Sequence, residues 1–274
     1  MSDLTLMAVH AHPDDESAST GGILAKYARQ GVRTIVVTCT NGEMGDATGG
    51  IKPADPGHNA AAVVEKRREE LRAACEVLGV THLEMLGYQD SGMMGWPQND
   101  APEAFWHTPV DEGAKRLAVL MEQYQPDVVV TYDEYGFYGH PDHIQANRIT
   151  VAATDMTKIP KKLYYTTVPR EALQQMFTML KDLNIQEPGG EEFDPTDPPI
   201  GVPAEQVTTT VDVAEFVDAK RAALQAHASQ TESSFFLQMP EDIFRFAFAS
   251  ESFTRERDVT GAPIPENDLF AGLR

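Results

Sequence analysis

The sequence predicts an α/β fold of the Rossmann-like, doubly wound type, in which helices sandwich a mostly parallel sheet. Three observations support this prediction. Residues 4–10 form a short apolar run, residues 19–31 have helical spacing that ends at Gly31, and residues 32–38 are rich in β-branched side chains. Strand, helix and strand in this order form a βαβ unit, whose strands pair in parallel. Ligands of such folds bind at the carboxyl ends of the strands.

The same alternation continues along the chain. After the first βαβ unit we expect a helix, a strand and a second helix, then a strongly apolar strand, a further helix and another strand. Their expected ranges are 61–78, 82–86, 109–124, 126–132, 142–156 and 163–167. We expect a catalytic core over 1–185 and a smaller C-terminal α/β extension over 186–274. The extension would complete the substrate pocket without folding on its own, and it begins with an acidic loop over 186–202.

Composition limits the kind of partner. The chain has 274 residues with 22 Lys and Arg against 42 Asp and Glu, a net charge of −20. This balance argues against a nucleic-acid or anionic-membrane binder, which needs a basic surface. Two cysteines, no secretory signal and no long apolar run predict a cytoplasmic protein without membrane insertion. A homo-oligomer is compatible with the sequence.

The segment that follows the first expected strand concentrates polar groups. Residues 10–16 read HAHPDDE, with two histidines and three carboxylates. Helix capping accounts for Pro13 and for one carboxylate. His12 and Asp15 are three residues apart on a turn, so they can converge on one ion. An imidazole and a carboxylate are two of the three protein ligands of an open catalytic zinc site.

A second segment of the same kind follows the strand over 126–132. It contains GHPDH, in which His140 and His143 are three residues apart and HPD occurs again. Two such segments at two strand ends predict a metal site shared between them. A set of histidines and carboxylates without cysteine favours zinc, with ferrous iron or another divalent cation as alternatives.

These paired motifs resemble the LmbE-like (PIG-L) family of metal-dependent deacetylases related to N-acetylglucosaminyl-phosphatidylinositol de-N-acetylase. The likeness runs from about residue 4 to about residue 230 and is strongest to the mycothiol-pathway branch, which contains N-acetylglucosaminyl-inositol deacetylases and mycothiol S-conjugate amidases. The resemblance implies that His12, Asp15 and His143 hold zinc. It also implies that Asp14 is the general base and that His140 stabilises the oxyanion.

Further roles follow from the same likeness and from amide chemistry. We expect His140 to act as an imidazolium, with Asp142 available to keep it protonated and oriented. Tyr138 resembles a family tyrosine that assists at the same oxyanion, although an aromatic loop anchor explains it equally well. Glu16 is expected to orient the ligating side chains.

The substrate is expected to meet polar groups at neighbouring strand ends. Glu43 follows the second strand and Asp90 follows the third. Arg67 matches a family arginine that binds the polar head of the substrate, but the adjacent Arg68 leaves the register open. We expect His227, in the motif AHASQ, as a weaker pocket candidate. The loop over 93–106 would wall the pocket.

The sequence therefore predicts a zinc-dependent hydrolase that removes an acetyl group from a small N-acetylglucosaminyl-inositol type of substrate. One alternative is an amidase that cleaves mycothiol S-conjugates or another amidated glycoside; residues 17–19 read SAS, which departs from the lysine typical of the amidase branch. A metal-binding scaffold and a nucleotide-binding α/β domain are the non-enzymatic alternatives. Gly21 and Gly22 lack the G-x-G-x-x-G pattern, and carboxylates at the first strand end would repel a pyrophosphate.

Overall fold

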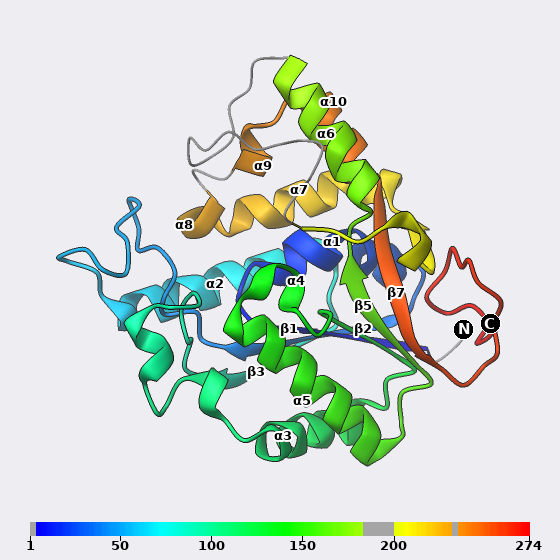
Figure 1. The fold of residues 1–274 in the computed structure, drawn as a ribbon, viewed down its shortest axis with the longest axis horizontal. Coiled ribbons are helices and arrows are strands. Elements are labelled where there is room, and N and C mark those ends of the chain that lie inside the picture. The colour runs from blue at the N-terminus through cyan, green and yellow to red at the C-terminus, as the bar shows by residue number, and fades with distance from the viewer. Residues whose placement is uncertain (1–3, 183–199, 232–234) are drawn as a thin grey trace.

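The computed structural model of the protein describes residues 4–182, 200–231 and 235–274. A seven-stranded sheet with the strand order β3-β2-β1-β4-β5-β7-β6 forms its centre (Figure 1). The strands are β1 (Thr5–His10), β2 (Arg33–Thr40), β3 (His82–Tyr88), β4 (Val128–Thr131), β5 (Lys162–Thr167), β6 (Thr209–Asp212) and β7 (Ser250–Asp258). β1 to β5 run parallel, whereas β7 pairs antiparallel with both β5 and β6. The predicted α/β fold with a mostly parallel sheet is confirmed.

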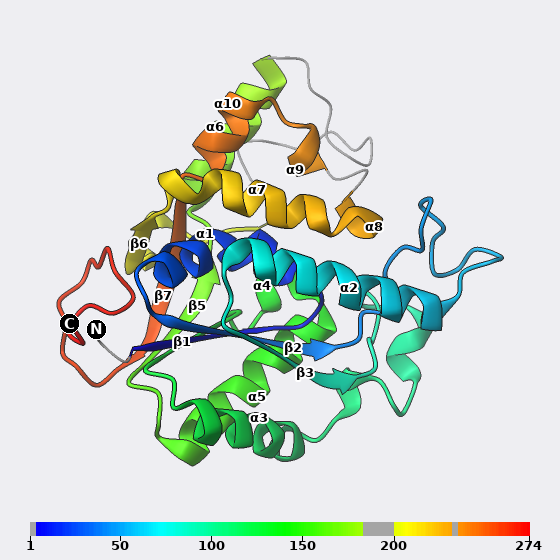
Figure 2. The same ribbon diagram turned by 180° about the vertical axis from the view of Figure 1, so that it is seen from behind.

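Helices cover both faces of this sheet. The α-helices are α1 (Asp15–Arg29), α2 (Ala60–Leu78), α3 (Val110–Tyr124), α4 (Gly136–Gly139), α5 (Pro141–Thr157), α6 (Arg170–Asp182), α7 (Val217–Ala226), α8 (Ala228–Thr231), α9 (Phe235–Gln238) and α10 (Glu241–Ala247). α1 and α2 lie on one face, with α7 packed over them, and α3 and α5 lie on the other face (Figure 1 and Figure 2). The result is a three-layer sandwich.

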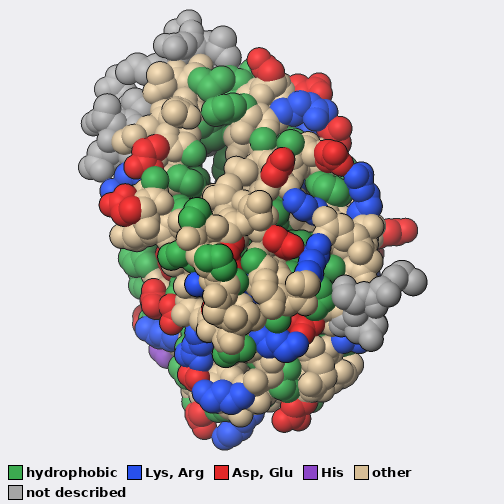
Figure 3. Space-filling model, turned by 90° about the vertical axis from the view of Figure 1, so that its right-hand side faces the viewer, with side chains coloured by type: hydrophobic (Ala, Val, Ile, Leu, Met, Phe, Trp, Pro, Cys, Tyr) green, Lys and Arg blue, Asp and Glu red, His purple; other side chains and the backbone are tan. Residues whose placement is uncertain are grey.

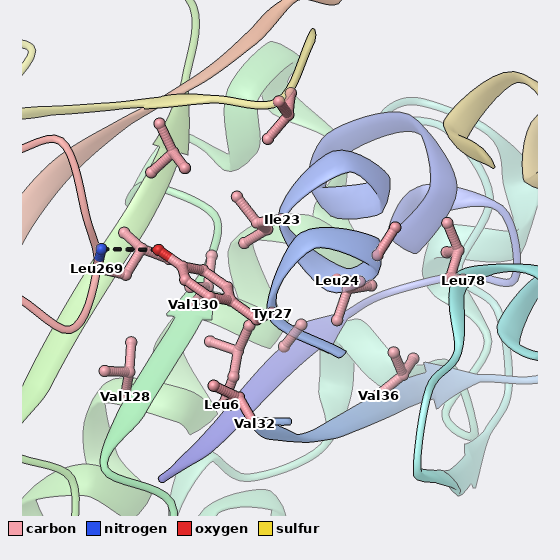
Figure 4. Packing of buried hydrophobic residues seen from close by; sticks show 14 of the residues in the cluster. Leu6, Ile23, Leu24, Tyr27, Val32, Val36, Leu78, Val128, Val130 and Leu269 are labelled. Atoms are coloured by element: carbon pink, nitrogen blue, oxygen red, sulfur yellow. Dashed lines mark hydrogen bonds between the residues drawn. The ribbon is translucent and has the colours of Figure 1, made fainter. Parts of the chain in front are cut away.

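The two faces of β1 explain why its sequence is continuously apolar. Successive side chains of a strand point to opposite faces, so Leu6 packs under α1 while Met7 packs toward α3 and α5. Figure 4 shows Ile23 and Tyr27 of α1 above the strands, with the Tyr27 hydroxyl accepting a hydrogen bond from the Leu269 amide at 2.9 Å. Burial of each such large apolar side chain stabilises the fold by roughly 1.5–3 kcal/mol.

The C-terminal part of the described chain continues the same sheet. β7 carries Glu251, whose carboxylate accepts hydrogen bonds from the amides of Gly22 and Ile23 at 2.8 Å each. Lys220 of α7 pairs with the same carboxylate at 2.6 Å. A side chain at position 22 would collide with Glu251 and with Val213, so this close approach requires glycine.

Several boundaries differ from those expected. α1 begins at Asp15, four residues before the expected start, because Asp15 and Glu16 occupy its first turn, where the helix dipole favours negative charge. Most of the predicted acidic loop, residues 186–199, lies outside the described residues, as does the expected division at 185. α6, β6 and β7 add regular structure for which the sequence patterns supplied no ranges.

The surface carries charges of both signs. On the face shown in Figure 3, lysine and arginine side chains are interspersed with aspartate and glutamate. Exposed pairs such as Arg29 with Glu215, at 2.6 Å, contribute at most about 1 kcal/mol each. Among the helices of the described ranges, none combines the length and the apolar character needed to cross a bilayer.

Candidate active site

A cavity of about 180 Å³ lies at the carboxyl ends of the parallel strands. β1 and β4 are neighbours there because the chain continues on one side of β1 through β2 and β3 and then crosses to the other side. Loops after β1, β2, β3 and β4 line the cavity, together with one residue each from α1, α2, α4 and α8. The lining residues are His12, Asp14, Asp15, Met44, Gly45, Arg67, Asp90, Gly92, Met93, Trp96, Tyr138, His140 and Gln230.

The turn between β1 and α1 is held in a strained conformation. Asp14 has a φ of +111°, which L-residues rarely adopt and which costs about 1–3 kcal/mol. Its amide donates to Glu16 Oε2 at 3.0 Å. Arg67 Nη2 donates to the carbonyl of Pro13 at 2.5 Å and to Asp14 Oδ2 at 3.2 Å. These bonds keep the Asp14 carboxyl at the cavity wall, where 27% of the side chain is exposed.

The three predicted metal ligands lie together. Asp15 is 3.3 Å from His12, measured from Oδ2 to Nδ1, and 3.5 Å from His143, measured from Oδ1 to Nε2. His143 Nδ1 faces the carbonyl of Gly136 at 3.2 Å, so its Nε2 is left as a buried acceptor without a hydrogen-bond partner. Ligands of a tetrahedral zinc ion with bonds of about 2.05 Å stand about 3.3 Å apart. The donor types and their spacing therefore fit a divalent cation.

His140 belongs to the same group of side chains. Ring nitrogens of His12, His140 and His143 all lie within 4.8 Å of one another. A second group with this spacing consists of His12, His140, Asp90 and Asp142. Among the described residues, these histidines and carboxylates could hold a metal ion.

Charge and burial set the protonation of the ligands. Burial raises the pKa of Asp15, but His143 and His12 outweigh it and hold that pKa well below its usual range. Burial lowers the pKa of His143 to about 4, despite opposition from Asp15. For His12, burial is outweighed by the carboxylates of Asp90, Asp142 and Asp15, so its pKa is raised well above the usual value. Without a bound cation, the site at neutral pH thus has an ionised Asp15, a neutral His143 and a protonated His12, whose proton a metal ion would displace.

Asp14 differs from its neighbour. Burial raises the pKa of Asp14 to about 6, with Arg67 opposing this effect and Asp15 adding to it. A carboxylate with a pKa near the operating pH is suited to accept and return a proton. The two adjacent aspartates therefore have environments that shift their pKa values in opposite directions.

The expected role of Asp142 requires a correction. Its carboxylate does not hold the His140 ring: Oδ2 lies 3.2 Å from His12 Nε2 and accepts the Ser91 amide at 2.9 Å, and Oδ1 accepts the Ser91 hydroxyl. Asp142 thus contacts the predicted ligand His12 instead of His140. A carboxylate in this position orients a metal-binding histidine. Ser91 was not singled out from the sequence, because a lone serine in a loop carries no recognisable signal.

The surroundings of His140 favour a neutral imidazole over the expected imidazolium. Its Nδ1 accepts a hydrogen bond from the backbone amide of Asp142 at 3.1 Å, and an imidazolium has no acceptor to offer. Burial, assisted by the neighbouring His12 and His143, lowers the pKa of His140 to about 2. The remaining proton is on Nε2, so the neutral ring can still donate one hydrogen bond.

Other predicted residues divide between the cavity and its surroundings. Tyr138 and Asp90 line the cavity, and Asp90 Oδ1 accepts the Gly92 amide at 2.8 Å. Glu43 is not among the lining residues; burial raises its pKa, and its Oε2 is buried without a hydrogen-bond partner. The loop predicted to wall the pocket does so through Met93 and Trp96.

The structure resolves the choice between the two arginines of α2. Arg67 is buried against the cavity and also donates to the Gly42 carbonyl at 2.6 Å. Arg68 points away and pairs with Glu65 at 3.1 Å on the helix surface. Arg67 is therefore the residue that faces the pocket.

The AHASQ motif supports the site from the C-terminal side. His227 is fully buried and its Nε2 lies 2.8 Å from Glu16 Oε1, so the expectation that it lines the pocket is wrong. Gln230 lines the pocket instead, with Oε1 accepting the Asp46 amide at 3.1 Å and Nε2 donating to the Asp46 carbonyl at 2.8 Å. Glu16 holds the Asp14 amide and His227 rather than a predicted metal ligand. The motif was visible in the sequence, but which of its side chains reaches the cavity was not.

Comparison with known proteins identifies the family. Residues 7–154, which include both HPD segments, match the family described as PIG-L: GlcNAc-PI de-N-acetylase. The chain belongs to this family. Two relatives named 1D-myo-inositol 2-acetamido-2-deoxy-alpha-D-glucopyranoside deacetylase are similar over nearly the whole chain. One, from Thermomonospora curvata, is 40% identical over 99% of this chain and 97% of its own length. The other, from Acidothermus cellulolyticus, is 43% identical over 98% and 95%.

Solved structures share the PIG-L fold at lower sequence identity. The N,N'-diacetylchitobiose deacetylase from Pyrococcus horikoshii superimposes with a TM-score of 0.56 over 92% of this chain and 83% of its own. Its sequence identity to this chain is 20%, so the likeness establishes the architecture alone. The family resemblance expected from the paired motifs is confirmed.

Proposed function

We propose that this PIG-L family protein removes the acetyl group from N-acetylglucosaminyl-inositol, that is, 1D-myo-inositol 2-acetamido-2-deoxy-α-D-glucopyranoside. The observation that carries the proposal is the pair Asp14 and Asp15. The Asp15 carboxylate is ionised and lies at metal-ligand spacing from two histidines, and the Asp14 carboxyl, with a pKa of about 6, lines the same cavity. Similarity along almost the full chain to two deacetylases of that name supports the choice of substrate.

We assign the metal centre to His12, Asp15 and His143. The donor set of two imidazoles and one carboxylate suits zinc and leaves a fourth position open. Zinc, when bound there, supplies a Lewis acid for the amide carbonyl and lowers the pKa of water. Asp142 orients His12 through its Nε2, and the Gly136 carbonyl orients His143 through its Nδ1.

The side chains around the cavity can carry the proton transfers of amide hydrolysis. Asp14 accepts the proton of the attacking water and, once protonated, returns it to the departing amine. The Nε2–H of His140 donates to the oxygen on which negative charge develops, and the Tyr138 hydroxyl is available as a second donor. Release of acetate and a free amino sugar completes the balance.

The cavity favours a single sugar ring at its base. Its volume of about 180 Å³ is below the roughly 300–1,000 Å³ of clefts that enclose drug-sized ligands. Arg67 and Asp90 offer hydrogen-bonding groups for sugar hydroxyls, and Trp96, 40% exposed, provides an aromatic wall. The N-acetylglucosamine ring would occupy this space, and the inositol ring would lie toward the open side.

Release of primary amine from defined substrates tests the proposal. Purified protein loaded with zinc is incubated with N-acetylglucosaminyl-inositol, with free N-acetylglucosamine and with a mycothiol S-conjugate, each with and without a chelator. We expect chelator-sensitive release that is fastest from the inositol glycoside. Faster cleavage of the conjugate would instead assign the protein as an amidase, and no release from any of the three would refute the choice of substrate.

The identity of the metal is tested separately. Apoprotein prepared with a chelator is reconstituted with Zn²⁺, Fe²⁺ or Co²⁺, and bound metal and turnover are measured for each. We expect one ion per chain and recovery of turnover with Zn²⁺. Loss of ion binding in His12→Ala, at retained thermal stability of the apoprotein, would support the assigned ligands.

A further inference from the structure

Tyr132 is the first residue after β4, and it contacts both segments of the predicted metal centre. Its side chain is buried, with 1% of the residue exposed. The hydroxyl donates to Asp15 Oδ2 at 2.7 Å and accepts the Ala11 amide at 2.9 Å. The ring stacks on the His143 ring at a centroid distance of 4.1 Å and an interplanar angle of 16°.

The two carboxylate oxygens of Asp15 make different contacts. Oδ2 accepts from the Tyr132 hydroxyl and from the His12 amide, at 2.7 and 2.8 Å, and also lies 3.3 Å from His12 Nδ1. Oδ1 is the oxygen that faces His143 Nε2, at 3.5 Å. The hydroxyl thereby fixes the rotation of the carboxylate, and the ring fixes the plane of the imidazole.

The surroundings hold Tyr132 itself in place. Asn147 of α5 donates from Nδ2 to the Tyr132 carbonyl at 2.8 Å. β4 lies beside β1 in the sheet, so the residue that follows β4 is brought against the turn that follows β1. One aromatic side chain thus joins the first HPD segment to the second.

We propose that Tyr132 is a positioning residue of the metal centre, which holds Asp15 through its hydroxyl and His143 through its ring. This inference rests on the metal centre of the proposed function. Tyr132 would not touch the substrate or the reacting atoms; it would act on the free energy of metal binding through the two ligands. Loss of such an orienting partner typically weakens metal affinity by about 10–100-fold.

Two variants separate the contributions of the hydroxyl and the ring. Tyr132→Phe retains the ring on His143 but removes the donor to Asp15, and we expect a metal dissociation constant about tenfold higher. Tyr132→Leu removes both contacts, and we expect a larger loss, toward a hundredfold. Dissociation constants for Zn²⁺ are measured by competition with a fluorescent chelator, and the visible absorption of the Co²⁺ forms reports the ligand geometry.

A matched control distinguishes positioning from general destabilisation. Tyr164 is also fully buried, and its hydroxyl donates to Glu266 Oε2 at 2.8 Å, away from the cavity. Tyr164→Phe should lower the thermal stability of the apoprotein without changing metal affinity. Thermal melts of all apoproteins accompany the titrations, so that each affinity refers to folded protein.

The outcomes are distinct. Wild-type metal affinity in both Tyr132 variants would overturn the positioning role and leave the metal centre intact. A wild-type protein that binds no divalent cation would overturn the metal centre and this inference with it. Weakened metal binding in the Tyr132 variants would uphold the inference even where none of the tested sugars is deacetylated, because only the substrate assignment would then have failed.

Discussion

Replacement of Asp14 by asparagine should separate activity from stability. The pKa of Asp14 lies at about 6, above the usual 3.8, chiefly because of burial. Raising a carboxyl pKa by this amount costs the ionised native state roughly 3 kcal/mol. Asparagine has the same shape, tolerates a positive φ and can still accept a hydrogen bond from Arg67, but it carries no charge.

We therefore expect Asp14→Asn to be more stable than the wild type and nearly inactive. Above pH 6 the wild-type carboxylate is ionised in both states, so the variant should gain up to about 3 kcal/mol at pH 7. The gain should shrink as the pH falls from about 6 toward the unfolded-state pKa of 3.8, and it should be below about 1 kcal/mol at pH 4. Loss of the general base should reduce kcat by about 10²–10⁴-fold at unchanged metal content.

Urea unfolding of the apoproteins at pH 7 and pH 4, metal analysis and steady-state kinetics measure these three quantities. Asp155→Asn is a suitable control, because Asp155 lies on the surface and pairs with Arg257, which holds its pKa below the usual range. This control should keep wild-type turnover and gain no stability. Near-normal kcat in Asp14→Asn would refute Asp14 as the base, and a less stable variant at pH 7 would refute the argument from burial.

Three further predictions concern the same site. On the acid side of its pH profile, kcat/KM should fall about tenfold per pH unit below the pKa of Asp14. This pKa is about 6 without a bound cation and lower with one, so a decline that begins above pH 7 would contradict the assignment. Arg67→Lys should raise KM at least about tenfold, because a lysine cannot bond all the acceptors of Arg67, which are two backbone carbonyls and the Asp14 carboxylate. Arg68→Lys should have wild-type kinetics, and equal effects of the two variants would contradict the assignment of Arg67. Tyr138→Phe should lower kcat with little change in KM, and an unchanged kcat would leave Tyr138 as a loop anchor alone.

The sequence predicted the parts of the fold that repeat a simple pattern. Strands buried on both faces are continuously apolar, so the ranges 4–10 and 126–132 closely match β1 and β4. β7 reads SESFTRERD, in which charged residues interrupt the apolar ones, so its place inside the sheet was not apparent. Its position depends on pairing with β5, a contact between segments about ninety residues apart in sequence.

The site was predictable where residue type alone limits the chemistry. The two HPD segments at strand ends predicted one shared site, and the family resemblance added the choice of His12 and His143 as ligands. The spacing did not predict which histidine Asp142 contacts, because the rotation of its carboxylate depends on Ser91. The neutral state of His140 follows from a single backbone amide, whose direction no sequence pattern reveals.

The contact between Glu16 and His227 has a consequence for the order of synthesis. It joins residues 211 positions apart, yet it fixes the carboxylate that holds the Asp14 turn. Residue 227 must therefore be synthesised before this contact can support the strained turn, although the first βαβ unit can form much earlier from local contacts. Nascent chains that stop between residues 143 and 227 would carry both HPD segments and still lack this support for the turn that holds the base.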